Sequence, residues 1–108
     1  MTYEPCNLGF STADGEDVRL SFSRGDLRLE FRDWQEKAIA VRFEEAIRFS
    51  WTDDLDDAIG TDICYLVHDS PWTVTEPKEY GDTVFCHYKL CFNQCGTLDV
   101  VCAATSIE

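Results

Sequence analysis

Residues 17–32 read DVRLSFSRGDLRLEFR, and apolar side chains recur at every second position on both sides of a central Arg-Gly pair. This alternation is typical of β-strands that bury one face. Gly25 can adopt a positive φ without steric cost, as a tight hairpin turn requires. The stretch therefore predicts an antiparallel hairpin whose outward Arg and Glu side chains pair across the two strands.

The C-terminal part of the chain predicts a second hairpin. Residues 84–92 alternate between two faces, with His87 and Lys89 on the same one. A turn at residues 93–96 leads into a further alternating run that ends at Cys102. The two runs therefore predict a pair of adjacent antiparallel strands.

Residues 38–51 fit two interpretations. Apolar residues at positions 39, 41 and 43, and again at 47, 49 and 51, alternate as they would in strands. The same stretch also fits a period of 3.6 residues, which predicts a helix over about 35–50 and an α+β fold. We favour strands because β-branched and aromatic residues, which prefer strands, are dense in this stretch.

Two shorter segments complete the expected set of strands. Residues 63–67 form a compact apolar run, and Trp72 and Val74 suggest a short edge strand after Pro71. About eight short strands predict an all-β fold, with antiparallel strands arranged in a sandwich or a small barrel. A chain of 108 residues with 44% hydrophobic residues is expected to fold as a single domain, residues 1–108.

Charge is distributed unevenly along the chain. Residues 1–48 carry a net charge of −3 and residues 49–108 carry −9, which together give −12. Between Arg48 and Lys78 there is no basic residue but there are seven acidic ones. Phosphate binding requires basic side chains, so we expect neither nucleic acid nor an anionic membrane as a partner. Opposite charges steer association, so a basic protein is the expected partner.

The N-terminal residues predict the cellular compartment. The first twenty residues contain no apolar stretch of signal-peptide length, and no stretch of about 18 apolar residues occurs anywhere in the chain. We therefore expect a cytoplasmic protein. The six cysteines are expected to stay reduced there, because cytoplasmic thiol systems reduce disulfides.

The cysteines and aspartates predict no metal site and no cofactor. The spacings of Cys86, Cys91, Cys95 and Cys102 match no zinc-binding motif. Cys86 and Cys102 fall on apolar strand faces, where a free cysteine packs as a small hydrophobic residue, and Cys91 and Cys95 flank a turn where a disulfide is conceivable. The aspartates at positions 53–62 do not complete a calcium-binding loop, because isoleucine stands where such a loop needs glycine.

Catalytic signatures are also missing from the sequence. It contains no G-x-S-x-G motif, no glycine-rich phosphate loop and no H-E-x-x-H motif. His87 directly follows Cys86, and adjacent strand residues point to opposite faces, so these two cannot form a Cys–His nucleophile pair. We therefore expect no catalytic residues and a protein that is not an enzyme.

The acidic segment and its aromatic neighbours form the predicted contact surface. Large aromatic side chains beside carboxylates can anchor the Lys or Arg side chains of a basic partner. The predicted partner-binding residues are Trp51, Asp53, Asp54, Asp56, Asp57, Asp62 and Trp72. In the alternative interpretation, both tryptophans belong to the core and the aspartates form a solvated loop.

Three parts of the chain resemble small uncharacterised bacterial proteins: residues 25–31 (GDLRLEF), residues 41–44 (VRFE), and residues 87–92 (HYKLCF) with residues 98–100 (LDV). Some members of that group resemble immunity proteins of polymorphic toxin systems, which are acidic, cytosolic and bind a cognate toxin. The resemblance implies a non-catalytic, immunity-type inhibitor of a basic protein, and it assigns a role to no particular residue.

Two other functions remain open from the sequence. One is a small-molecule-binding or enzymatic β-barrel of unknown substrate, whose cavity would be lined by inward aromatic side chains. The other is a structural subunit that self-associates through an exposed sheet edge. The sequence does not predict whether the chain forms a homo-oligomer.

Overall fold

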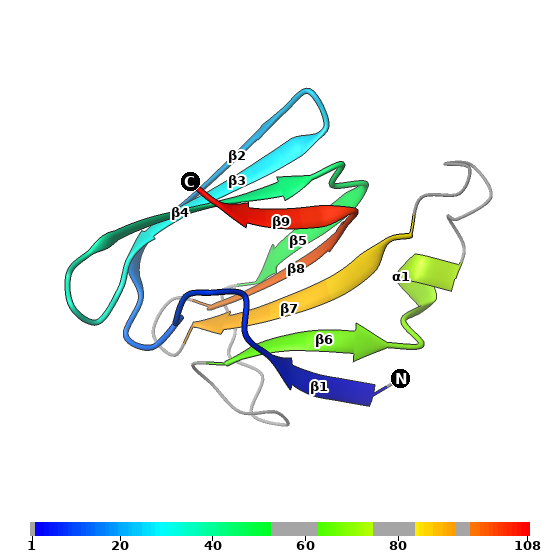
Figure 1. Cartoon of the computed structure of the whole chain (residues 1–108), viewed down its shortest axis with the longest axis horizontal. Helices are drawn as coiled ribbons and strands as arrows, with labels where there is room; N and C mark the ends of the chain where they lie inside the picture. The colour runs from blue at the N-terminus through cyan, green and yellow to red at the C-terminus, as the bar shows by residue number, and fades with distance from the viewer. Residues whose placement is uncertain (1, 53–62, 75–83, 93–95) are drawn as a thin grey trace.

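The computed structural model describes residues 2–52, 63–74, 84–92 and 96–108, and these residues form an all-β sandwich of two antiparallel sheets (Figure 1). The five-stranded sheet has the order β1-β6-β7-β8-β5, and the four-stranded sheet has the order β2-β3-β4-β9. The strands are β1 (Thr2–Cys6), β2 (Glu16–Ser23), β3 (Asp26–Arg32), β4 (Ala38–Glu44), β5 (Arg48–Thr52), β6 (Cys64–His68), β7 (Cys86–Phe92), β8 (Gly96–Cys102) and β9 (Ala104–Ile107). One helical turn, α1 (Pro71–Val74), follows β6.

The hairpin predicted from residues 17–32 is confirmed. Strands β2 and β3 pair antiparallel, with Ser23 opposite Asp26. Arg24 and Gly25 between them have φ values of 54° and 85°, the combination that a two-residue turn of type I′ needs. The predicted charge pairing on the outer side is present as well, because Arg32 Nη2 lies 3.2 Å from Glu16 Oε2 on the neighbouring strand.

The strand interpretation of residues 38–51 is confirmed, and the helix alternative over about 35–50 is wrong. Strand β4 belongs to the four-stranded sheet, whereas β5 belongs to the five-stranded sheet. The chain turns between them at Glu45, which has a φ of 50°. The next two residues are tied to both sheets, since the Ala46 N–H donates to the Gly25 carbonyl and the Ile47 N–H donates to the Val101 carbonyl.

The predicted edge strand at Trp72 and Val74 is wrong, because these residues belong to the helical turn α1. Pro71 suits the first position of a helix, where its missing N–H is not needed. Ser70 caps the turn through a hydrogen bond from the Trp72 N–H to its Oγ atom. In the described part of the chain, no helix is long and apolar enough to cross a membrane.

Strands β1 and β9 were not predicted from the alternation of apolar residues. β1 pairs antiparallel with β6 at one edge of its sheet, where Pro5 is tolerated. β9 pairs antiparallel with β4 at the edge of the other sheet. The two ends of the chain therefore belong to different sheets (Figure 1).

The hydrophobic core lies between the two sheets. Its fully buried members include Leu29 and Phe43 from the four-stranded sheet and Leu90 and Phe92 from the five-stranded sheet. Cys102 also belongs to this core with no exposed surface, as its place on an apolar face predicted. The inward side chains of β7 and β8 are thereby fixed, so their remaining side chains point to the outer face of the five-stranded sheet.

Candidate functional site

The predicted aspartates Asp53, Asp54, Asp56, Asp57 and Asp62 lie outside the described residues. The residues that flank this acidic segment are described. Thr52 lies opposite Thr97, and Thr97 lies opposite Cys91. The Cys91 N–H donates to the Ile63 carbonyl at 3.1 Å. Thr52 and Ile63 therefore lie in one row across the same end of the five-stranded sheet.

The two predicted tryptophans lie on opposite faces of that sheet. Trp51 packs against the core, with its ring centroid 6.0 Å from that of Phe92. Trp72 stacks on His87, which faces outward from β7, at 4.9 Å and an interplanar angle of 8°. Both tryptophans are half-buried. The structure does not bring them together, and an interface that includes Trp72 does not include Trp51.

A chain of hydrogen-bonded polar groups lies beneath Trp72. Ser70 Oγ lies 2.7 Å from His87 Nδ1, and His87 Nε2 lies 2.8 Å from Asp99 Oδ1. Lys89 Nζ donates to the other carboxylate oxygen of Asp99 at 3.1 Å. We refer to Ser70, His87, Lys89 and Asp99 as the polar network.

One protonation pattern gives each hydrogen bond of the polar network a donor and an acceptor. Ser70 Oγ accepts the Trp72 N–H, so its own hydrogen is free to go to His87 Nδ1. His87 then carries its proton on Nε2 and donates it to Asp99. Because buried polar groups are costly unless they are hydrogen-bonded, this pattern allows the network to be buried.

Three strands and one helical turn position the polar network. His87 and Lys89 are two residues apart on β7 and so share its outer face, and Lys89 lies opposite Asp99 on β8. Ser70 arrives from the end of β6 through Asp69, which adopts a left-handed φ of 55°. Arg48 on β5 places its guanidinium carbon 4.4 Å from the Trp72 ring centroid, a cation–π contact over the same region.

Serine, histidine and aspartate are the residue types of a hydrolase triad, but this arrangement does not present a nucleophile. Ser70 has 0% exposed surface, so no substrate reaches its hydroxyl in this conformation. One face of the His87 ring is covered by Trp72. The polar network therefore holds α1 against the five-stranded sheet and leaves the Ser70 hydroxyl without access for acyl transfer.

The carboxyl group of Asp99 is held in its charged form. Burial by itself raises the pKa of Asp99, but the hydrogen bond from His87 and the charge of Lys89 outweigh burial and lower the pKa below its usual value. A carboxyl whose pKa is lower in the folded than in the unfolded state stabilises the fold above the unfolded pKa of about 3.9. This contribution is lost as the pH falls through the folded pKa.

This shift predicts a pH dependence of stability that belongs to Asp99. Between about pH 5 and pH 3, the free energy of unfolding of the wild type is expected to fall more steeply than that of the Asp99→Asn variant. Urea denaturation at each pH, followed by circular dichroism, measures both slopes. Parallel curves for the two proteins would contradict a role for the Asp99 charge.

Sequence reasoning missed the polar network, although part of its signal was present. The prediction placed His87 and Lys89 on one strand face, and the following strand carries Asp99 as its outward acidic residue. Counting the register from the turn predicted at residues 93–96 would have set Lys89 opposite Val100, whereas β8 begins at Gly96 and Lys89 lies opposite Asp99. Ser70 could not be found from the register at all, because it is remote in sequence and approaches from another strand.

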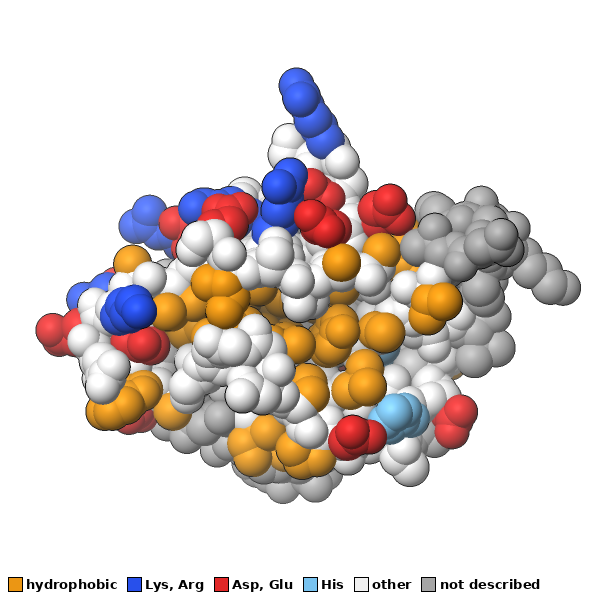
Figure 2. Space-filling model, viewed as in Figure 1, with side chains coloured by type: hydrophobic (Ala, Val, Ile, Leu, Met, Phe, Trp, Pro, Cys, Tyr) orange, Lys and Arg blue, Asp and Glu red, His pale blue; other side chains and the backbone are white. Residues whose placement is uncertain are grey.

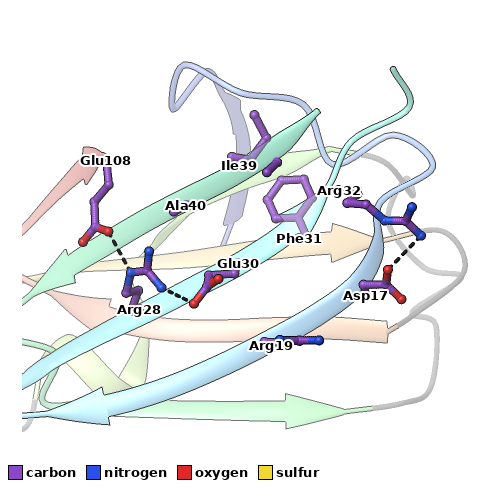
Figure 3. A pocket seen from close by; sticks show the side chains of 10 residues that line it. Asp17, Arg19, Arg28, Glu30, Phe31, Arg32, Ile39, Ala40 and Glu108 are labelled. Atoms are coloured by element: carbon purple, nitrogen blue, oxygen red, sulfur yellow. Dashed lines mark hydrogen bonds and ion pairs between the residues drawn. The ribbon is translucent and has the colours of Figure 1, made fainter. Parts of the chain in front are cut away.

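The outer face of the four-stranded sheet carries a shallow hollow. It has a volume of about 340 Å³ and lies over the small side chain of Ala40, beside Arg28 (Figure 3). Arg28 pairs with Glu30 and, at 2.7 Å, with Glu108. Figure 2 shows basic and acidic side chains intermixed over this part of the surface. The guanidinium group of Arg28 is therefore already neutralised by its neighbours.

Within the described ranges, no group of three or more His, Cys, Asp or Glu side chains is arranged to hold a metal ion. Comparison with known proteins adds no assignment: no protein-family model matches the chain, and neither curated proteins nor solved structures gave a match.

Proposed function

We propose that the protein is a non-catalytic acidic binding protein, an immunity-type inhibitor of a basic protein partner. The observation that carries this proposal is the uneven distribution of negative charge along the chain. Residues 49–108 carry a net −9, and the basic residues that could offset it lie mostly in residues 1–48. In that first part Arg28, Arg32 and Arg42 each already pair with carboxylates of their own sheet.

The residues that flank the acidic segment support the same function. Its flanking residues, Thr52 and Ile63, lie at one end of the five-stranded sheet, and Ile63 is 38% exposed. A sheet end with an exposed apolar side chain, preceded in the sequence by a dense run of aspartates, offers both burial and charge to a basic partner. The proposed contact surface therefore combines Ile63, at that end of the sheet, with the Asp53–Asp62 segment that precedes it in the sequence.

Charge reversal of the segment tests this surface. The variant with Asp53→Lys, Asp54→Lys and Asp56→Lys is expected to associate with the partner at least about tenfold more slowly, because complementary charge sets the encounter rate. The partner is the protein captured by the wild type from the native host or encoded by a neighbouring gene. Association is measured by surface plasmon resonance at low and physiological salt.

A matched variant serves as the control. Glu36→Lys, Glu44→Lys and Glu45→Lys change the net charge by the same amount, at exposed positions outside the proposed surface. At physiological salt, where salt screens the general effect of net charge, this control is expected to change the association rate by less than about twofold. An equal loss in both variants would overturn the proposed surface, and a captured partner that is acidic would overturn the proposed function.

The enzymatic alternative rests on the polar network alone. If it were correct, a fluorophosphonate probe would label the wild-type protein, and the label would disappear in the Ser70→Ala variant. Because Ser70 is fully buried, we expect no label on either protein. Labelling that depends on Ser70 would replace the inhibitor proposal with a hydrolase in which α1 moves aside.

A further inference from the structure

Four of the cysteines stand in two directly opposed pairs on neighbouring antiparallel strands. Cys6 of β1 lies opposite Cys64 of β6. Cys86 of β7 lies opposite Cys102 of β8. Two residues directly opposite each other in an antiparallel pair point to the same face of the sheet. Here that face is the inner one, because Cys64 and Cys102 both belong to the core.

The strand register brings each pair within disulfide reach. Directly opposed residues in antiparallel strands have Cα atoms about 4.5 or 5.5 Å apart, depending on the hydrogen-bonding position. Disulfides join Cα atoms that are about 4.4–6.8 Å apart. Each pair can therefore close without any change in how the strands are paired, and both pairs stand as free thiols in this structure.

Each pair combines one accessible thiol with one buried thiol. Cys6 and Cys86 are half-buried, whereas Cys64 and Cys102 are buried. Burial raises the pKa of Cys64 and of Cys102 to about 12 each. Burial, and then the charge of Glu4, raises the pKa of Cys6. The half-buried thiol is therefore the one that an oxidant from solution reaches first.

We propose that Cys6–Cys64 and Cys86–Cys102 are two disulfide-forming sites, which close when the protein meets a small-molecule disulfide. In a reducing compartment both pairs remain thiols. Under oxidation, the first bond fastens the edge strand β1 to β6, its one partner among the described strands, and the second fastens β7 to β8.

The reaction is two successive thiol–disulfide exchanges at each site. The Cys6 thiolate attacks one sulfur of the small disulfide, the sulfur–sulfur bond breaks, and one small thiolate leaves with the electron pair. The Cys64 thiolate then attacks Cys6 Sγ and displaces the second small thiolate. The two protons of the cysteines end on the two released thiols, so two cysteines are oxidised and one small disulfide is reduced to two thiols. Cys86 and Cys102 follow the same steps.

The test uses the whole protein with oxidised glutathione as the probe and dithiothreitol as the reducing reference. Non-reducing proteolysis and mass spectrometry are expected to recover two linked peptides, one joining Cys6 to Cys64 and one joining Cys86 to Cys102. Oxidation is expected to raise Tm by roughly 10 °C, because each bond closes a loop in the unfolded chain. Its rate is expected to rise about tenfold per pH unit near neutral pH, because the thiolate is the attacking form.

Variants at the accessible cysteines separate the two sites. Cys6→Ser is expected to lose only the first linked peptide and Cys86→Ser only the second, and both replace a half-buried side chain so that the core stays filled. A Cys91→Ser variant is the control and keeps both bonds, because Cys91 lies opposite Thr97 and not opposite a cysteine. Glutathione adducts without linked peptides, or links that join other cysteines, would overturn the proposal.

Discussion

Replacing Asp99 with alanine is expected to lower the free energy of unfolding by about 3–5 kcal/mol at neutral pH. The side chains of Asp99 and Lys89 are each 13% exposed, and that of His87 is 7% exposed. Removing the carboxylate leaves the largely buried ammonium of Lys89 without its counter-charge and the imidazole N–H of His87 without its acceptor. Guanidinium chloride denaturation followed by circular dichroism measures the loss.

Two further variants serve as comparisons for the Asp99→Ala variant. Asp99→Asn keeps an acceptor oxygen for His87 but removes the charge opposite Lys89, so it is expected to lose less than the alanine variant. Glu44→Ala, at an exposed position, is expected to stay within about 0.5 kcal/mol of the wild type. A loss at Asp99 no larger than that at Glu44 would show that the polar network does not stabilise α1 on the sheet.

Replacing Phe92 with alanine is expected to cost about 3–5 kcal/mol of unfolding free energy, because it leaves a cavity that the strands cannot collapse to fill. Phe92 has no exposed surface. Its ring is 5.1 Å from that of Phe31 on the opposite sheet and 6.0 Å from that of Trp51 on its own sheet. This one side chain therefore links the two layers of the sandwich.

Phe22 provides the matched control for Phe92. It contacts Phe49 at 5.4 Å between ring centroids, but it is 52% exposed. Phe22→Ala removes the same number of atoms and is expected to cost less than about 1.5 kcal/mol, since most of its ring already contacts water. Equal losses at the two positions, measured by the same denaturation experiment, would contradict a core centred on Phe92.

Much of the fold was predictable because alternation is a local property. The β2–β3 and β7–β8 hairpins follow from residues that are close in sequence and separated by turn residues. The structural predictions that were wrong or missing have local causes too. Pro71 after a capping serine favours a helical turn over the strand that Trp72 suggested. The edge strands β1 and β9 pair on one side only, so a weak alternation pattern suffices for them.

The candidate site was less predictable than the fold. The sequence identifies the acidic segment directly, because a charge count needs no structure. It grouped Trp51 with Trp72 because both flank that segment, although the two rings occupy opposite faces of one sheet. The polar network depends on β6, β7 and β8 lying side by side, and a contact between separate strands leaves no periodic trace along the chain.

The sequence by itself determined the all-β class, the two hairpins and the uneven charge, because each of these depends on neighbouring residues alone. Only the tertiary structure decided that β4 and β5 separate into different sheets, that Ser70 meets His87, and that Cys6 stands opposite Cys64. These arrangements follow from burying the apolar faces of both sheets against each other. That burial depends on the whole chain, so no single stretch of the sequence predicts which strands and side chains will meet.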